Sequence, residues 1–158
     1  MDALDRKVID LFAAEPRIGV LEASRRLGVA RGTVQARLDK LADSGVIIGW
    51  GPDLSAEALG YPVTAFLTLE IRQQEHEEGG DSGAHDAIGA RLARIPEVLE
   101  ACTITGPGDM WCRVVARSNT DLQRVIDAVL SIPGILRSST VIALATQVPY
   151  RVQPRLGL

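Results

Sequence analysis

The chain has 158 residues, of which 46% are hydrophobic and 23% are charged, and its formal net charge at pH 7 is −3. This apolar content excludes an intrinsically disordered chain, and the length suffices for one ordinary domain or two small ones. The negative net charge excludes a protein that coats nucleic acid through bulk positive charge, so any contact with DNA has to come from a local basic patch.

The membrane and redox signals favour a soluble cytoplasmic protein. No apolar run approaches the ~20 residues that spanning a membrane requires, and the first residues are amphipathic and charged, unlike a signal peptide. The two cysteines, Cys102 and Cys112, are too few for a disulfide framework, and neither His76 nor His85 lies at ligand spacing from them. We therefore expect reduced thiols, no metal and no cofactor.

The first 41 residues predict three helices. Apolar residues recur at helical spacing in three segments, and Pro16 follows the first of them as a helix stop. Gly28 lies in the short connection between the second and the third, where it is free to take a positive φ. Two helices joined in this way are the helix-turn-helix pattern. The expected inward-facing residues are Leu4, Val8, Leu11, Phe12, Val20, Ala23, Leu27, Val34, Leu38 and Leu41.

The third predicted helix has the composition of a helix that lies in a DNA groove. Between Arg25 and Lys40 five basic residues are opposed only by Asp39. Small residues let the helix backbone approach base edges, while hydroxyl, amide and guanidinium groups bind bases or phosphates. The residues expected to contact double-stranded DNA are Arg31, Gly32, Thr33, Gln35, Arg37 and Lys40. The alternative, a solvated basic face on a helical pair, is not excluded by spacing alone.

Residues 46–51 are rich in side chains that favour strands, and they follow a helix stop at residues 43–45. We predict a short strand at this point, in the place of a wing, so that residues 1–50 form a winged helix-turn-helix domain. Residues 51–60, which begin with Gly-Pro-Asp, are expected to be a linker. The second domain is then residues 61–158.

The second domain alternates predicted strands and helices. A period of two begins at Tyr61 and predicts a strand up to residue 71, followed by a polar surface loop over residues 73–83. Further on we predict a helix over 85–94, strands over 101–105 and 110–117, a second helix with a capping box made by Thr120 and Gln123, and a last strand over 138–146. An Ile-Pro pair follows each helix, at residues 95–96 and 132–133. The order βαββαβ predicts an α+β, ferredoxin-like domain with both helices on one face of an antiparallel sheet.

The other face of this sheet is expected to need a partner. Phe66 and Trp111 fall on that face, and no predicted helix is left to cover them. Packing the face on a second copy of itself would bury both rings by two-fold symmetry, so we predict a homodimer. With the turn at Pro107-Gly108, Cys102 and Cys112 fall on opposite faces of neighbouring strands and cannot pair.

Three blocks of sequence, in this order and spacing, resemble the Lrp/AsnC (feast/famine) family of transcriptional regulators. They are LDRKVIDLF near the start, RLGVARGTVQARLDKLADSGVIIGW through the predicted reading helix, and TGPGDMWCRVVA in the second domain. The resemblance covers nearly the whole chain. It implies a DNA-binding winged helix-turn-helix, and an effector-binding RAM domain, which is ACT-like, whose dimers assemble into octamers or other rings.

In the family that this sequence resembles, a small effector, usually an amino acid, binds between dimers near a Gly-x-x-Asp turn. The Asp109 carboxylate can accept hydrogen bonds from an α-amino group, while backbone N–H groups and hydroxyls can donate hydrogen bonds to an α-carboxylate. We expect a zwitterionic ligand with an apolar or neutral side chain. The residues expected to bind it are Gly106, Gly108 and Asp109 of the turn, with Thr103, Thr105, Ser139 and Thr140 on adjacent strands.

Two departures from the family pattern and two alternatives remain. Met110 stands where the family often has an aromatic residue, which leaves the effector's identity open, and Gly19 and Ala30 stand where helix-capping Ser or Thr is common. Sirohaem decarboxylases share the two-domain architecture, but they are expected to gather His, Tyr and Arg side chains that this sequence does not place together. The other alternative is an architectural DNA-binding protein without an effector.

Overall fold

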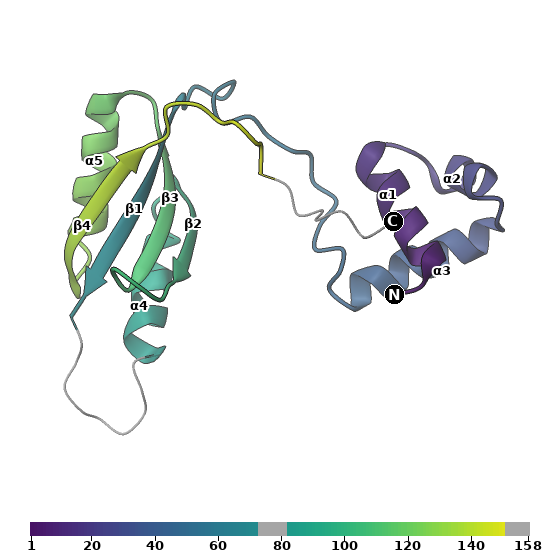
Figure 1. Ribbon diagram of the computed structural model, residues 1–158, viewed down its shortest axis with the longest axis horizontal. Helices are drawn as coiled ribbons and strands as arrows, with labels where there is room; N and C mark the ends of the chain where they lie inside the picture. The colour runs from purple at the N-terminus through teal and green to yellow at the C-terminus, as the bar shows by residue number, and fades with distance from the viewer. Residues whose placement is uncertain (73–81, 151–158) are drawn as a thin grey trace. The chain divides into compact units, whose positions relative to one another are not determined.

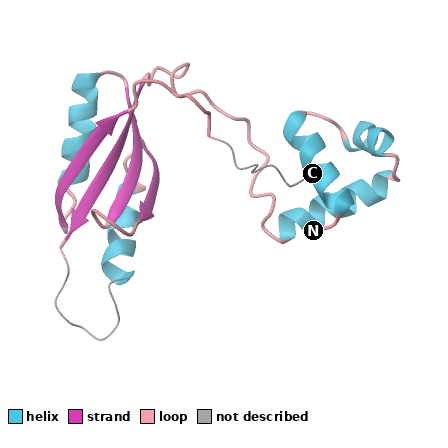
Figure 2. Ribbon diagram, in the orientation of Figure 1, coloured by secondary structure: helices cyan, strands magenta, loops and turns pink. Residues whose placement is uncertain are grey.

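The computed structural model describes residues 1–72 and 82–150, so most of the predicted polar loop, with His76, lies outside the described residues. The described chain forms two units, one built on Met1–Asp53 and the other on Leu54–Pro149 (Figure 1). The first is made of helices and the second of a sheet with two helices (Figure 2). Each unit has a hydrophobic core of its own.

The first unit is a three-helix cluster, as the apolar spacing predicted. Its helices are α1 (Ala3–Ala14), α2 (Val20–Leu27) and α3 (Arg31–Asp43). Gly28 ends α2 in the left-handed conformation, with a φ of 66°, which confirms its role in the connection to α3. The fully or almost fully buried apolar residues of the cluster are Val8, Ala23, Val34, Leu38 and Leu41.

The three helices begin in different ways. Asp2 caps α1 in a capping box, because its side chain accepts from the N–H groups of Leu4 and Asp5 while the Asp5 side chain accepts from the Asp2 N–H. Gly19 and Ala30, at the starts of α2 and α3, make no side-chain cap. The expected lack of capping side chains at these two positions is therefore confirmed.

The strand predicted over residues 46–51 is wrong. The N–H groups of Val46 and Ile47 both donate to the Leu41 carbonyl, so the chain turns back on the end of α3. Trp50 then packs edge-on against Phe12 of α1, with ring centroids 6.2 Å apart. A strand needs a partner for its backbone hydrogen bonds, and this segment pairs with no second strand among the described residues. Ile47 packs on the helical core instead, while Val46 and Ile48 are exposed.

The second unit has the predicted order βαββαβ. Its elements are β1 (Val63–Ile71), α4 (Ser82–Leu92), β2 (Val98–Thr103), β3 (Met110–Ala116), α5 (Asn119–Leu130) and β4 (Ile135–Ile142). The sheet has the order β2-β3-β1-β4, and every neighbouring pair is antiparallel. This is the predicted split βαβ arrangement, with β3 between β2 and β1, and β1 between β3 and β4.

Both helices of this unit pack on one face of the sheet (Figure 2). Alternate residues of β1, such as Leu67 and Leu69, are fully buried in a core with residues of α4 and α5. Burial, together with the neighbouring Cys102, raises the pKa of the Cys112 thiol on this face to about 11. Cys102 is exposed and pairs with Trp111 across the strands, so the two cysteines lie on opposite faces as predicted.

The second face of the sheet carries the predicted aromatic pair. Phe66 and Trp111 stack with their ring centroids 5.4 Å apart, and the Arg113 guanidinium lies 6.0 Å from the Trp111 ring. No helix in the part of the chain that the structure describes packs on this face. We refer to it as the aromatic face, defined by Phe66 and Trp111.

Several predicted boundaries in this unit are wrong. The first helix begins at Ser82 instead of residue 85, and β2 begins at Val98, because the Ile-Pro turn leads directly into the strand. The same turn precedes β4, which therefore spans Ile135–Ile142 and not residues 138–146. The cap of α5 is Ser118, whose hydroxyl accepts from the Asp121 N–H, and not Thr120. No helix within residues 1–72 and 82–150 is long and apolar enough to cross a membrane.

Candidate functional site

The surface of α3 that faces away from the core contains most of the residues predicted to bind DNA. Arg31, Gly32 and Gln35 are exposed, and Thr33 is half-buried. The Gln35 amide donates to Asp39 one turn further along, at 2.8 Å, so it is oriented along the helix surface. These four residues lie within the first five positions of α3, the part of a reading helix that usually contacts base edges.

Arg37 and Lys40 have a different environment from the other predicted DNA contacts. Arg37 donates to the Asp5 carboxylate at 2.8 Å and also to the Asp2 carboxylate, and Lys40 lies 3.4 Å from Asp5. The Asp5 side chain is fully buried between the two helices. The Asp2 N–H and the Arg37 guanidinium, which both donate to this carboxylate, lower the pKa of Asp5 to about 2. Asp5 is therefore ionised, and it binds two cations of α3.

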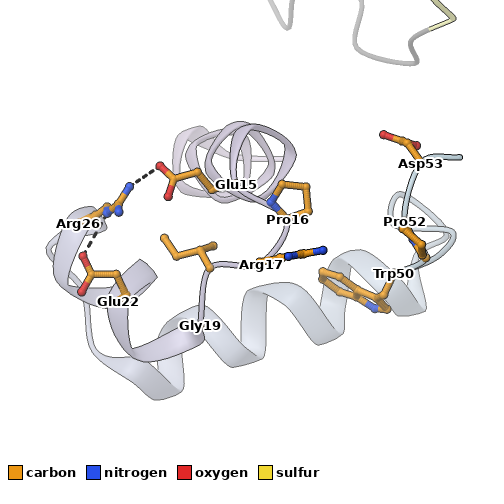
Figure 3. A pocket seen from close by; sticks show the side chains of 11 residues that line it. Glu15, Pro16, Arg17, Gly19, Glu22, Arg26, Trp50, Pro52 and Asp53 are labelled. Carbon is orange, nitrogen blue, oxygen red and sulfur yellow. Dashed lines mark hydrogen bonds and ion pairs between the residues drawn. The ribbon is translucent and has the colours of Figure 1, made fainter. Parts of the chain in front are cut away.

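Arg25 and Arg26 of α2 are also occupied. Arg26 donates to Glu15 at 2.5 Å and to Glu22 at 3.2 Å, as Figure 3 shows, and Arg25 lies 3.7 Å from Glu22. Glu15, Glu22 and Arg26 border an open pocket of about 930 Å³ beside the start of α2, and Trp50 also lines it. The pocket is lined by an ion-paired cluster and an aromatic ring. No pattern in the sequence pointed to this pocket.

The predicted basic patch is thus largely neutralised inside the first unit. Among the described residues, Arg31 is the only one of the five basic residues between Arg25 and Lys40 without an ion pair. The patch looked unopposed because all of its acidic partners precede that window: Asp2, Asp5 and Glu15 lie on α1 or at its ends, and Glu22 lies on α2. Arg31 is consequently the free cation at the start of α3.

The predicted effector turn, residues 106–109, is attached to β1. The Asp109 N–H donates to the Leu69 carbonyl at 2.8 Å, and the Asp109 carboxylate accepts from the Ile71 N–H at 2.7 Å. Gly108 has a φ of +95°, and a Cβ at this position would lie 2.4 Å from Cγ2 of Thr68. The turn therefore lies against β1 more closely than a residue with a side chain permits, and one oxygen of Asp109 is used to hold it there.

A pocket of about 380 Å³ lies where the turn meets β1 and β4. The Arg137 guanidinium donates to the Glu70 carboxylate at 2.6 Å, and both side chains keep substantial exposure to solvent. A zwitterion that replaces this exposed ion pair can place its carboxylate on the base and its ammonium group on the acid. The lining residues are Thr68, Glu70, Pro107, Arg137, Ser138 and Ser139.

The structure brings together only part of the predicted effector site. Ser139 lies in the same pocket as Pro107 of the turn, but Thr103 ends β2 at the other edge of the sheet, because β2 and β4 are separated by β3 and β1. Thr105 lies outside the strands, in the segment that leads into the turn. Three strand spacings amount to about 14 Å. The expectation that these threonines and Ser139 lie on adjacent strands is therefore wrong. Thr140 follows Ser139 and points to the opposite face of β4.

Glu70 and Arg137 are not among the residues predicted from the sequence to bind the effector. They are 67 residues apart, and only the pairing of β1 with β4 brings them opposite each other. Within the described ranges there is no group of three or more His, Cys, Asp or Glu residues that could hold a metal ion.

Comparisons with known proteins agree on both units. Residues 64–152 match the Lrp/AsnC ligand-binding domain, and residues 1–48 match a winged helix-turn-helix DNA-binding domain. The chain is 30% identical to the HTH-type transcriptional regulator FL11 of Pyrococcus horikoshii, over 92% of this chain and 91% of that protein. The structure of Escherichia coli AsnC is similar with a TM-score of 0.84 at 27% identity, over 98% of this chain and 99% of that one. A feast or famine regulatory protein from M. tuberculosis complexed with L-methionine has the same fold, with a TM-score of 0.83 at 24% identity, over 96% and 97%.

Proposed function

Because the chain belongs to the Lrp/AsnC family of DNA-binding transcriptional regulators, we propose that it reads DNA through the start of α3 and that an amino acid controls its assembly. The first half of this proposal rests on one observation. Arg31, at the start of an otherwise ion-paired helix, is the cation free to meet DNA, with Gly32, Thr33 and Gln35 beside it.

The chemistry of these four residues fits the major groove of double-stranded DNA. A guanidinium at Arg31 can bind guanine or a phosphate, and the amide of Gln35 can bind adenine. The lack of a side chain at Gly32 leaves room for the helix backbone to approach the bases. Lys40 keeps 60% of its side-chain surface exposed, so it can reach a phosphate at the edge of the contact, whereas Arg37 is 28% exposed.

Arg31→Ala is expected to weaken binding to a selected DNA duplex by about 1 to 3 kcal/mol and to relax its sequence preference. Lys40→Ala should weaken binding to all DNA sequences alike and lower the dependence of affinity on salt concentration. Fluorescence anisotropy with a duplex selected from a random-sequence library, and with a scrambled duplex, measures both effects. Lys7→Ala, which removes an exposed cation on α1, is the matched control. Unchanged affinity in Arg31→Ala would remove Arg31 from the DNA contact.

The second half of the proposal places a zwitterionic amino acid in the pocket between the turn and β4. Arg137 can bind its α-carboxylate and Glu70 its α-amino group, while the Ser139 hydroxyl offers a further hydrogen bond. We expect the N–H groups of Gly106 and Gly108, which flank the lining residue Pro107, to offer others. Asp109 supports this arrangement, because its N–H group and its carboxylate both bond to the backbone of β1 and hold the turn beside the pocket. The L-methionine complex of the M. tuberculosis relative supports the class of ligand.

We propose that the functional assembly is a homodimer, and that dimers form an octamer or another ring. A ligand bound between dimers makes contacts that exist only in the assembled state, so its binding energy shifts the assembly equilibrium. The reciprocal effect is that assembly raises the affinity for the ligand. Through this equilibrium the amino acid would change the number and spacing of DNA-reading helices.

Arg137→Ala is expected to shift the stabilisation that the protein gains from its effector to much higher effector concentrations. The loss of a charge-assisted hydrogen bond costs about 1.5 to 3 kcal/mol, which is a ten- to hundred-fold loss of affinity. A thermal-shift screen of the twenty amino acids identifies the effector for the unchanged protein, and the same titration is repeated on the variant. Arg91→Ala, on the exposed surface of α4, is the control. If none of the twenty shifts the unchanged protein, it acts without an amino-acid effector.

A further inference from the structure

The carboxylate of Asp5 is the fully buried acidic group of the described first unit, and both of its oxygens are bound. Oδ1 accepts from Arg37 at 2.8 Å. Oδ2 accepts from the Asp2 N–H at 3.0 Å and lies 3.4 Å from the Lys40 ammonium. One group of α1 thus holds two residues of α3 that lie one turn apart.

Stability alone explains this arrangement poorly. Taking a carboxylate out of water is costly, and well-packed apolar residues often replace buried ion pairs without loss of stability. The apolar stripe of Val34, Leu38 and Leu41 already attaches α3 to the core. Apolar packing is non-directional, whereas hydrogen bonds to a fixed carboxylate have preferred distances and angles. The cluster therefore defines the rotation of α3 about its own axis.

The rotation of α3 matters because its outward residues have to meet base edges. A helix with its side chains is 10–12 Å across, so a rotation of about 20° moves an outward group by about 2 Å. Hydrogen bonds to bases tolerate a far smaller displacement, since their donor–acceptor distances span roughly 2.7–3.2 Å. A small error in the rotation of α3 would thus break contacts to bases while leaving contacts to phosphates largely available.

We propose that Asp5 is a positioning residue for sequence recognition, which acts through Arg37 to fix the rotation of α3 toward DNA. In this role Arg37 contacts α1 and does not contact DNA. The proposal rests on the proposed function of Arg31, Gly32, Thr33 and Gln35 as the residues that read bases. It predicts that breaking the cluster reduces discrimination between sequences more than it reduces binding itself.

The test uses the full chain and a duplex that the unchanged protein selects from a random-sequence library. Affinities for this duplex and for a scrambled duplex of the same composition are measured at several salt concentrations. Asp5→Asn removes the charge and keeps the shape of the side chain. Asp10→Asn makes the same change in charge on the same helix, at an exposed position without an ion pair among the described residues. A thermal unfolding curve for each variant establishes whether that variant is folded at the assay temperature.

In Asp5→Asn the ratio of the two affinities is expected to fall about ten-fold, the equivalent of one base contact, while Asp10→Asn leaves it unchanged. Arg37→Gln should lower the ratio to a similar extent. It should leave the slope of log affinity against log salt unchanged, because Arg37 neutralises no phosphate. The double variant should be no worse than the worse single variant, since both changes break the same contact.

Three results would overturn the proposal. The first is an unchanged ratio in a folded Asp5→Asn protein. The second is a salt slope that Arg37→Gln reduces by about 0.9, the signature of a lost phosphate contact. The third is additive losses in the double variant. If Asp5→Asn does not fold, the ratio and slope of Arg37→Gln decide the matter. An unchanged protein that selects no sequence refutes base reading as well, which distinguishes that failure from the failure of positioning alone.

Discussion

Trp111→Glu is expected to convert the protein from a dimer into a monomer at micromolar concentration. Trp111 stacks on Phe66 in the middle of the aromatic face, and α4 and α5 cover only the opposite face of the sheet. A second copy of this face, related by a two-fold axis, would bury both rings. A carboxylate at position 111 would then be desolvated next to its own symmetry mate, at a cost of several kcal/mol for each charge.

Light scattering on the full chain measures this effect directly. Leu130→Glu is the matched control, because Leu130 is an exposed apolar residue on α5, on the helix-covered side of the sheet. That variant should keep the mass of the unchanged protein. A Trp111→Glu protein that remains dimeric would show that the two-fold contact lies on another surface.

Gly108→Ala is expected to destabilise the second unit by about 2 to 5 kcal/mol. A residue with a side chain at a positive φ costs roughly 1 to 2 kcal/mol, and forcing a methyl group into packed atoms costs typically 1 to 3 kcal/mol more. Here the new Cβ would lie 2.4 Å from Cγ2 of Thr68 and 3.2 Å from the Leu69 carbonyl oxygen, so both costs apply. That is a large part of the 5–15 kcal/mol by which domains are usually stable.

Two companion variants separate strain from collision. Gly106 has a comparable φ of +112°, but no atom lies within 4 Å of a Cβ at this position. The loss of stability in Gly106→Ala should therefore come from backbone strain alone. Thr68→Ser removes the methyl group that the new Cβ meets, and it should restore part of the stability lost in Gly108→Ala. Urea unfolding can be followed by tryptophan fluorescence in a Trp50→Phe background, where Trp111 is the remaining tryptophan. Equal losses in the two alanine variants would contradict the close approach of the turn to β1.

The sequence predicted those features that depend on local periodicity. The alternation along β1 and the stripe of Val34, Leu38 and Leu41 appear in the structure as buried positions. Both signals arise within a single element, because a helix or strand that buries one face repeats its apolar residues at its own period. Local turn chemistry was also informative, as Gly28 shows at the end of α2.

The features that could not be predicted depend on partners far away in the chain. Asp5 and Arg37 are 32 residues apart, so a window around the basic segment counted Arg37 as a free cation. Thr103 and Ser139 both lie close to the turn in the predicted layout, but the order of the strands puts them on opposite edges of the sheet, and the local sequence does not contain that order. Residues 46–51 have strand-like composition, but a strand also requires a neighbour, and composition does not supply one.

The opposite placement of the two thiols makes Cys102 a chemical reporter of assembly. An alkylating reagent needs an accessible thiolate, which the buried Cys112, with its raised pKa, does not offer. Cys102 lies directly across from Trp111, on the face where we expect the second copy to bind. A maleimide fluorophore should therefore label one position of the chain, and the rate of labelling should fall as the protein concentration rises and subunits associate. If the proposed homodimer forms through this face, the rate of labelling at Cys102 measures its association constant without any added probe.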